Sequence, residues 1–157
     1  MFQKRWSQGE PAVKLQALLA AAEKFAQTRE AEVDQTGTLR GALVIAAEEE
    51  IRDLLIEDLN AVVGLDPKLA LAATDSQADG ELNRVYKRVM AYDFGHIGGE
   101  PKPEGIRKVQ RAWVKYRDAW LDFVKVARPE ISPQAMANWQ TRHRIGQLRT
   151  ITGDAKP

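Results

Sequence analysis

The chain has 157 residues, and its 44% hydrophobic and 29% charged fractions are those of a globular domain with a buried core, not of a disordered segment. It contains no cysteine and only two histidines, which excludes disulfides, thiolate metal sites, a cysteine nucleophile and most His-rich metal sites. The net charge of +1 combines an acidic half, with eight basic against 13 acidic residues over 1–78, and a basic half, with 15 against nine over 79–157.

The first half of the chain shows helical periodicity and no sustained strand pattern. A first helix is expected with Pro11 in its first turn. Its apolar stripe consists of Leu15, Leu18, Ala22, Phe25 and Ala26. A second helix is expected to begin near Thr38, after the Thr36-Gly37 break, and to end at the punctuation from Gly64 to Pro67. Its apolar positions are Leu43, Ala47, Ile51, Leu54, Leu55, Leu59 and Val62.

A third helix is expected from Asp75 or Ser76, both good N-caps, to about Tyr92. The segment from Asp93 to Pro103 is rich in glycine and proline and is expected to be a loop.

A fourth helix is expected to open at Pro103 or Glu104 and to close at Arg128-Pro129. Its apolar stripe consists of Ile106, Val109, Trp113, Tyr116, Trp120 and Val124. A last helix is expected to begin with Ser132 as its cap and Pro133 in its first turn.

Five helices with short connections predict an all-α antiparallel bundle that forms one domain over residues 1–157. Residues 10–64 would be its N-terminal helical pair. A degenerate duplicated helical hairpin is a further hypothesis, because the segment 25–31 (Phe-Ala-Gln-Thr-Arg-Glu-Ala) resembles 113–119 (Trp-Val-Lys-Tyr-Arg-Asp-Ala). A chance match over so short a window is equally compatible with this similarity.

Polar residues interrupt the apolar faces of the third and fourth helices. Asn83 and Tyr86 are three positions apart on the third helix, and Gln110, Trp113 and Arg117 share one face of the fourth. If these two helices pack together, their polar groups would meet and form a satisfied hydrogen-bonded network. Such a network is more often a structural device than a binding site.

Three segments carry a family resemblance. They are Asp79-Gly-Glu-Leu82-Asn83-Arg-Val-Tyr86, Val109-Gln110-Arg-Ala-Trp113-Val-Lys-Tyr116-Arg117-Asp118-Ala119, and Arg144 with Leu148. In this order and spacing, over about residues 75–151, they resemble the LprI-like lysozyme-inhibitor domain. The matching signature residues are Asp79, Leu82, Asn83, Tyr86, Gln110, Trp113, Arg117, Asp118, Arg144 and Leu148.

The resemblance implies a small helical bacterial domain that is exported to the periplasm or secreted. It further implies a non-enzymatic protein that binds a lysozyme and blocks its cleft. Family members usually carry cysteines, one of them just after the Arg-Asp pair, where this chain has Trp120 and Leu121. Packing of Trp113, Trp120 and Trp139 is expected to replace the missing disulfides.

Two groups of residues are candidates for the contact with a partner. His96 lies in the loop from Asp93 to Pro103 and could enter an enzyme cleft and bind its catalytic carboxylates. Glu48, Glu49 and Asp53 of the second helix could attract a cationic lysozyme.

The other function classes are weaker. The same fold could bind another envelope protein or a polymer without inhibiting lysozyme. A helical nucleic-acid-associated protein is a third alternative, since four basic residues lie close together on the fourth helix: Arg107, Lys108, Arg111 and Lys115. No catalytic residues, metal site or cofactor are predicted, and no run of about 18 apolar residues predicts a membrane span. The polar stretch from Met1 to Glu10 is not expected to be a signal peptide.

Overall fold

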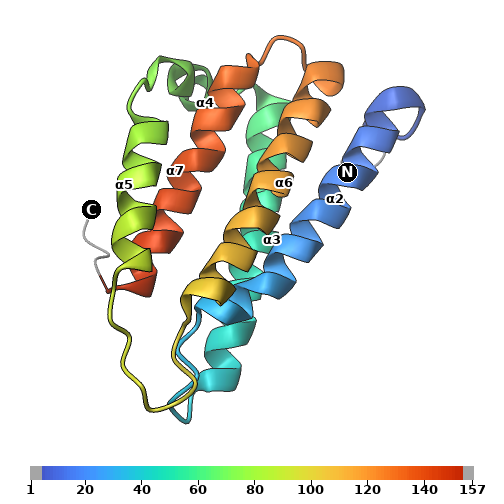
Figure 1. Ribbon diagram of the computed structural model, residues 1–157. Coiled ribbons are helices and arrows are strands. Elements are labelled where there is room, and N and C mark those ends of the chain that lie inside the picture. Colours follow the sequence, from blue (N-terminus) through green and yellow to red (C-terminus); the bar gives the residue numbers. More distant parts are fainter. Residues whose placement is uncertain (1–4, 154–157) are drawn as a thin grey trace.

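The computed structural model describes residues 5–153, and the regular elements in this range are all helical (Figure 1). They are, in chain order, α2 (Gly9–Thr28), η1 (Arg29–Glu32), α3 (Arg40–Gly64), α4 (Pro67–Leu71), η2 (Ala72–Thr74), α5 (Ala78–Met90), α6 (Pro103–Ala127) and α7 (Pro133–Ile151). The predicted all-α class is confirmed. The first four residues of the polar stretch Met1–Glu10, and the chain after Gly153, lie outside the described residues.

The ends of the long helices follow the local chemistry of the chain. The Ser132 hydroxyl accepts a hydrogen bond from the Ala135 amide at 3.0 Å and so caps α7. Pro103 occupies the first turn of α6, where its missing N–H costs nothing. The helix ends at Ala127, just before the Arg128-Pro129 pair that was expected to close it.

The connection between α3 and α5 contains two short helical stretches that periodicity did not predict. Asp66 caps α4 by accepting from the Lys68 amide at 2.8 Å, and η2 follows at once. A five-residue helix is too short to show an apolar stripe. As a result α5 begins at Ala78, later than the predicted start at Asp75 or Ser76.

The five long helices run up and down the bundle, but α7 lies between α5 and α6 (Figure 1). The tightest packing joins α2 to α6, α5 to α7, α2 to α3 and α6 to α7. Most of these neighbours are antiparallel. The pair α5 and α7 is parallel, because both helices run toward the end of the bundle that carries the loop 91–102 (Figure 1).

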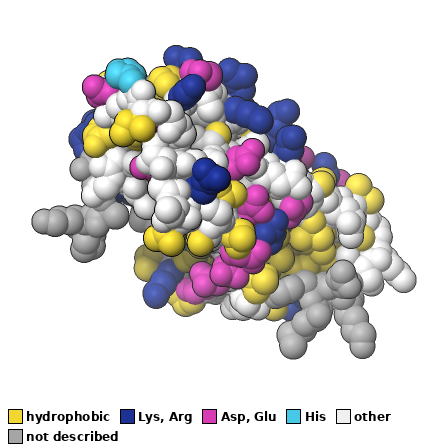
Figure 2. Space-filling view, turned by 90° about the horizontal axis from the view of Figure 1, so that it is seen from below, with side chains coloured by type: hydrophobic (Ala, Val, Ile, Leu, Met, Phe, Trp, Pro, Cys, Tyr) yellow, Lys and Arg dark blue, Asp and Glu magenta, His cyan; other side chains and the backbone are white. Residues whose placement is uncertain are grey.

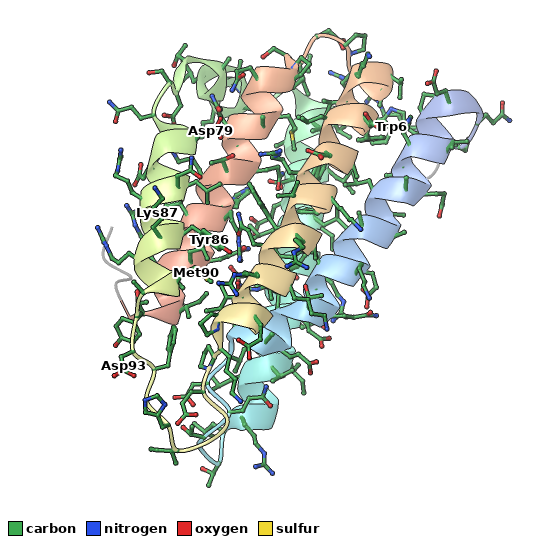
Figure 3. All side chains as sticks on the ribbon, in the orientation of Figure 1. Trp6, Asp79, Tyr86, Lys87, Met90 and Asp93 are labelled. Carbon is green, nitrogen blue, oxygen red and sulfur yellow. The ribbon has the colours of Figure 1, made fainter. Side chains whose placement is uncertain are left out.

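This arrangement corrects the predicted polar network between the third and fourth helices. Asn83 on α5 is exposed, and Tyr86 points from α5 toward the bundle interior, where it packs against the core (Figure 3). On α6, Gln110 bonds Arg144 of α7, and Arg117 bonds its neighbour Asp118 at 3.2 Å. The polar groups of α5 and α6 do not meet because α7 separates the two helices.

Aromatic side chains fill the centre of the core. Trp120 is fully buried and makes edge contacts with Tyr116 and Phe123. Trp6 packs edge-on against Phe123 at 4.9 Å between ring centroids, which ties the start of the described chain to α6. Edge-to-face contacts of this kind add to the stabilisation that burial of the rings provides.

A buried carboxylate joins α3 to α7. Asp58 is 1% exposed and accepts hydrogen bonds from the Trp139 indole at 2.6 Å and the Gln140 amide at 2.7 Å. The ring of His143 lies 3.1 Å from the same carboxylate. Trp139 is half-buried and packs against the core cluster that contains Trp113 and Trp120, and its indole also donates to Asp58.

Replacing Asp58 with Ala is expected to lower the free energy of unfolding by about 2–4 kcal/mol, because the Trp139 and Gln140 donors would lose their acceptor. Urea denaturation measures the change. The matched control is Asp53→Ala on the same helix, where the side chain is exposed and the expected change is within about 0.5 kcal/mol. Equal stabilities for the two variants would contradict the assigned role of Asp58.

Candidate functional site

The loop 91–102 crosses the end of α7 to connect α5 with α6 (Figure 1). Two carboxylates hold it in one shape. Glu100 accepts from the amides of Ile97 and Gly98, the second at 2.8 Å, and Asp93 accepts from the Gly95 amide at 2.9 Å. Hydrogen bonds within the loop therefore fix its conformation.

One backbone contact anchors this loop to the connection between η1 and α3. The Gly99 carbonyl accepts from the Gln35 amide at 2.8 Å. Gly99 has φ +95°, and a Cβ at this position would lie 3.0 Å from the Gln35 carbonyl carbon. Glycine is needed here both for the left-handed backbone and for the close approach of the two segments.

The tip of the loop presents two exposed side chains, His96 and Ile97. Ile97 is 89% exposed, although the carboxylate of Glu100 fixes its backbone amide. The tip therefore presents an apolar side chain to solvent from a backbone that hydrogen bonds hold in place. The structure thus places the predicted contact residue His96 beside an apolar neighbour that the sequence analysis did not single out.

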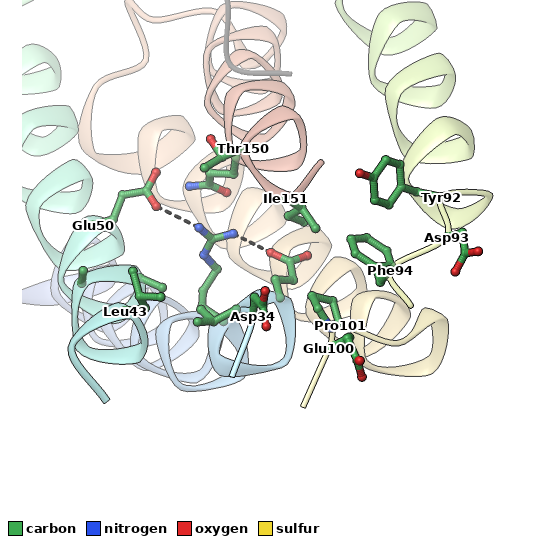
Figure 4. Close-up of a pocket in the computed structure, with 16 residues that line it drawn as sticks. Asp34, Leu43, Glu50, Tyr92, Asp93, Phe94, Glu100, Pro101, Thr150 and Ile151 are labelled. Carbon is green, nitrogen blue, oxygen red and sulfur yellow. Dashed lines mark hydrogen bonds and ion pairs between the residues drawn. The ribbon is translucent and has the colours of Figure 1, made fainter. Parts of the chain in front are cut away.

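A hollow of about 510 Å³ opens next to the loop, at the same end of the bundle (Figure 4). Its walls come from η1 and the segment after it, from α3, from the loop and from the end of α7. The apolar lining residues are Val33, Leu43, Ala46, Ala47, Tyr92, Phe94, Pro101 and Ile151. The polar and charged ones are Arg29, Glu32, Asp34, Glu50, Asp93, Glu100, Gln147 and Thr150.

Buried ion pairs form the floor of this hollow. Arg144 is fully buried. Both of its terminal nitrogens donate to the Glu32 carboxylate, Nη1 at 3.0 Å, and its Nε donates to the Gln110 side chain at 2.9 Å. Arg29 donates to the same Glu32 and to Glu50, the latter at 2.8 Å. Two guanidinium groups thus face two carboxylates, and the floor carries no net charge.

The charge state of Glu32 follows from its partners. Burial acts to raise the pKa of this carboxyl, but the charges and hydrogen bonds of Arg144 and Arg29 outweigh it and hold the pKa below its usual value of 4.5. Glu32 is therefore ionised at neutral pH, as a buried carboxylate between two arginines must be.

Three further carboxylates stand at the rim: Asp34, Asp93 and Glu100. Each accepts hydrogen bonds from neutral backbone or hydroxyl groups, and none forms an ion pair within residues 5–153. The Thr36 hydroxyl and amide hold the pKa of Asp34 below its usual range, and backbone amides do the same for Glu100. The rim therefore carries fixed negative charge without a counter-ion from residues 5–153.

The acidic residues proposed from the sequence have a different environment. Glu48 and Glu49 both pair with Arg52, at 3.2 and 2.6 Å, and Glu23 of α2 shares the same guanidinium. Asp53 is exposed and forms no ion pair among the described residues. Only Glu50 of this acidic run lines the hollow.

The signature residues are distributed between core and surface. Leu82, Trp113, Arg144 and Leu148 are buried; Tyr86, Gln110 and Arg117 are half-buried; Asp79, Asn83 and Asp118 are exposed. The Arg117 guanidinium lies 5.2 Å from the Trp113 ring centroid and covers it. Most of these residues hold α5, α6 and α7 in place. Gln110 bonds Arg144, which in turn holds Glu32 of the hollow from behind its lining.

The charged floor was not predicted, although the sequence contains a signal for it. Arg29 and Glu32 follow Phe25 and Ala26 at helical spacing and so continue the apolar stripe of α2. Charged residues at such positions point into the core and need buried partners. Glu32 finds its partner Arg144 more than a hundred residues away, which local periodicity cannot show.

Exposed basic residues of α5 and α6 lie outside the lining of the hollow. The four bases considered for nucleic acid, Arg107, Lys108, Arg111 and Lys115, are exposed on α6, and α5 adds exposed Arg84, Lys87 and Arg88. None of these seven forms an ion pair within the described part of the chain. Figure 2 views the loop end of the bundle, with bases along one edge and acidic and hydrophobic side chains mixed across the middle.

The fold and the site define a helical bundle with an ordered loop and an acid-rimmed hollow at one end. The sequence matches the family described as lysozyme inhibitor LprI over residues 68–150, just over half of the chain. The chain belongs to this family, and the match runs from α4 through the whole loop to the end of α7. No curated protein and no solved structure matches the chain.

Two further findings concern residues 5–153. None of the helices in this range has the length and apolarity that a membrane span requires. The same residues contain no group of three or more histidine, aspartate or glutamate side chains placed to hold a metal ion.

Glu32→Gln is expected to reduce the free energy of unfolding near neutral pH by about 3 kcal/mol, because it leaves the buried guanidinium of Arg144 without a charged partner and that of Arg29 with Glu50 alone. The pKa of Glu32 is depressed in the folded state, so its contribution is present above about pH 4.5 and lost as the pH falls through the folded value. The difference between wild type and variant should therefore shrink below pH 4.5. Urea denaturation from pH 3 to 7, with Glu57→Gln as the control, tests this; a constant difference would contradict it.

Gly99→Ala is expected to release the loop from Gln35, at a cost of about 1–3 kcal/mol. The readout is hydrogen exchange of the Gln35 amide, which should lose its protection. Gly98→Ala is the matched control, since its φ of +103° imposes similar backbone strain but a Cβ there meets no neighbour. Equal protection of Gln35 in both variants would show that the close approach of Gly99 does not matter.

Proposed function

We propose that this chain inhibits a lysozyme by seating the loop end of its bundle over the enzyme's cleft. The observation that carries the proposal is the ordered loop tip, with Ile97 89% exposed beside His96 and fixed carboxylates behind it. Membership of the lysozyme inhibitor LprI family supports the same function, and the matched residues include the entire loop.

The chemistry of the tip suits a glycosidase cleft. Glycosidases commonly work with a pair of carboxyl groups that flank the scissile bond. The imidazole of His96 can donate a hydrogen bond to such a carboxylate, while Ile97 fills apolar space in the cleft. Because hydrogen bonds already order the loop, little conformational entropy is lost on binding.

The charge of the loop end suits a cationic enzyme such as a chicken-type lysozyme. The rim acids Asp34, Asp93 and Glu100 have no counter-ion among the described residues, so they can attract a basic surface over a distance. Glu48 and Glu49 contribute less than the sequence indicates, because Arg52 neutralises part of their charge. Asp53 remains available on the outside of α3.

In this proposal the protein acts by occlusion and catalyses no reaction. Its place of action is the periplasm or the exterior of a bacterial cell, where a host or competitor lysozyme would be met. The matching family description supports the inhibitor role. The remaining signature residues act as scaffold, since they hold the three helices that carry the loop and the floor of the hollow.

The test is turbidimetric lysis of bacterial cell walls by chicken-type, invertebrate-type and goose-type lysozymes, with and without equimolar protein. Stoichiometric inhibition of one type is expected. His96→Ala and Ile97→Ser should each weaken inhibition about tenfold, as expected for contacts at the centre of an interface. Ile56→Ser is the matched control, because Ile56 is also exposed, at 52%, but lies on α3 and does not line the hollow.

Two results would contradict the proposal. One is the absence of inhibition for all three lysozyme types. The other is inhibition that Ile97→Ser and Ile56→Ser reduce equally, which would place the contact elsewhere.

The second candidate is a binding module for an anionic envelope polymer. The exposed basic residues of α5 and of α6 favour it, because none of them lines the hollow and none forms an ion pair among residues 5–153. Affinity for such a polymer that falls steeply with salt, together with no inhibition of lysozyme, would favour this function. Equally steep salt dependence with DNA or RNA would favour the nucleic-acid alternative.

A further inference from the structure

We propose that the hollow beside the loop is a second contact site, which receives a basic side chain of the partner protein together with an apolar neighbour. The inference rests on the proposed function in taking a cationic protein as the partner. It differs from that function in assigning a site that lies beside the loop tip and has its own chemistry.

The charges at the hollow favour a cationic guest. The floor is neutral, because Arg29 and Arg144 balance Glu32 and Glu50. The rim then adds Asp34, Asp93 and Glu100, which no basic residue in the described part of the chain neutralises. A lysine or arginine of a partner would supply the missing positive charge, whereas an anionic guest would meet three carboxylates.

Glu50 offers a carboxylate oxygen for this cation. One of its oxygens accepts from Arg29 at 2.8 Å, and the other has no partner among the described residues. The side chain is 43% exposed and lines the hollow. A guest ammonium or guanidinium group can therefore reach Glu50 without breaking the existing ion pair, and such charge-assisted bonds are strong.

An independent sign of a ligand is the state of Gln147. This residue of α7 is 4% exposed and lines the hollow, yet its one contact is a long one, 3.5 Å from Arg144 to its side-chain oxygen. Its amide nitrogen donates to no group within residues 5–153. The buried Nε of Arg29 also lacks an acceptor. The amide nitrogen of Gln147 is therefore available to donate to a carbonyl oxygen of a peptide segment bound in the hollow.

The apolar wall of the hollow can contact the apolar residue of the partner that neighbours its basic side chain. Leu43 and Tyr92 are 46% and 48% exposed, and the ring of Tyr92 lies 4.8 Å from that of Phe94 between centroids (Figure 4). Leu43 belongs to the apolar stripe that was expected to face the core. Aromatic rings attract a cation over their faces, and the aliphatic side chains can cover an apolar residue beside it.

The experiment is an NMR titration of the whole protein with the dipeptide acetyl-Leu-Arg-amide and with its uncharged isostere acetyl-Leu-citrulline-amide. The arginine peptide is expected to shift amide signals in 43–50, 92–101 and 147–151. The citrulline peptide should bind about tenfold more weakly, which corresponds to about 1.4 kcal/mol.

Variants locate the site. Glu50→Gln and Tyr92→Ala should each lower the affinity for the arginine peptide several-fold. Tyr92 takes no part in the buried ion pairs, so its loss leaves the fold intact. Glu57→Gln is the control, as an exposed acid of the same helix that does not line the hollow. Equal affinity for the two peptides, no binding, or shifts confined to 107–115 would overturn the proposal.

The two proposals fail in different ways. Peptide binding at the hollow without inhibition of any lysozyme would support the contact site and contradict the proposal that lysozyme is its partner. Inhibition that Ile97→Ser abolishes, combined with no peptide binding, would keep the inhibitor and remove the hollow as a contact site.

Discussion

The buried pair of Arg144 and Glu32 is the interaction on which the rest of the structure depends. Its two side chains are 0% and 2% exposed, and it connects η1 to α7 while Gln110 of α6 holds the same guanidinium. Removing Glu32 would leave the buried guanidinium of Arg144 without a charged partner, and removing Arg144 would leave Glu32 with Arg29 alone. Either loss is costly in a medium of low dielectric constant. The pair therefore fixes the relative position of the elements that surround the hollow, and Arg29 extends it to Glu50 of α3.

The properties of the loop end follow from this arrangement of helices. Because α7 separates α5 from α6, their connection must cross the end of α7, and the crossing needs a long segment. Glycines and loop carboxylates give that segment a fixed shape and leave its tip exposed. The same carboxylates carry negative charge that no base of the described chain neutralises. Order, exposed apolar surface and negative charge thus arise together from one connection.

The sequence was sufficient to predict the five long helices and insufficient to predict how they pack against one another. Caps and prolines located α6 and α7, because Pro103, Ser132 and Pro133 act within one turn of their own positions. The predicted meeting of Asn83 with Arg117 was wrong, since the order of helices in space depends on long-range packing. The same limit applies to the site: Glu32 and Arg144 are far apart in sequence, and the rim acids come from two separate segments.

The most direct test of the central claim is hydrogen exchange of the protein in complex with the lysozyme type that it inhibits. Amide protection on binding should be confined to the loop end, in residues 33–50, 92–101 and 147–151. The face of α6 that bears Arg107, Lys108, Arg111 and Lys115 should exchange as in the free protein. Protection of that basic face, with the loop end unchanged, would contradict the claim that the loop and its hollow form the contact surface.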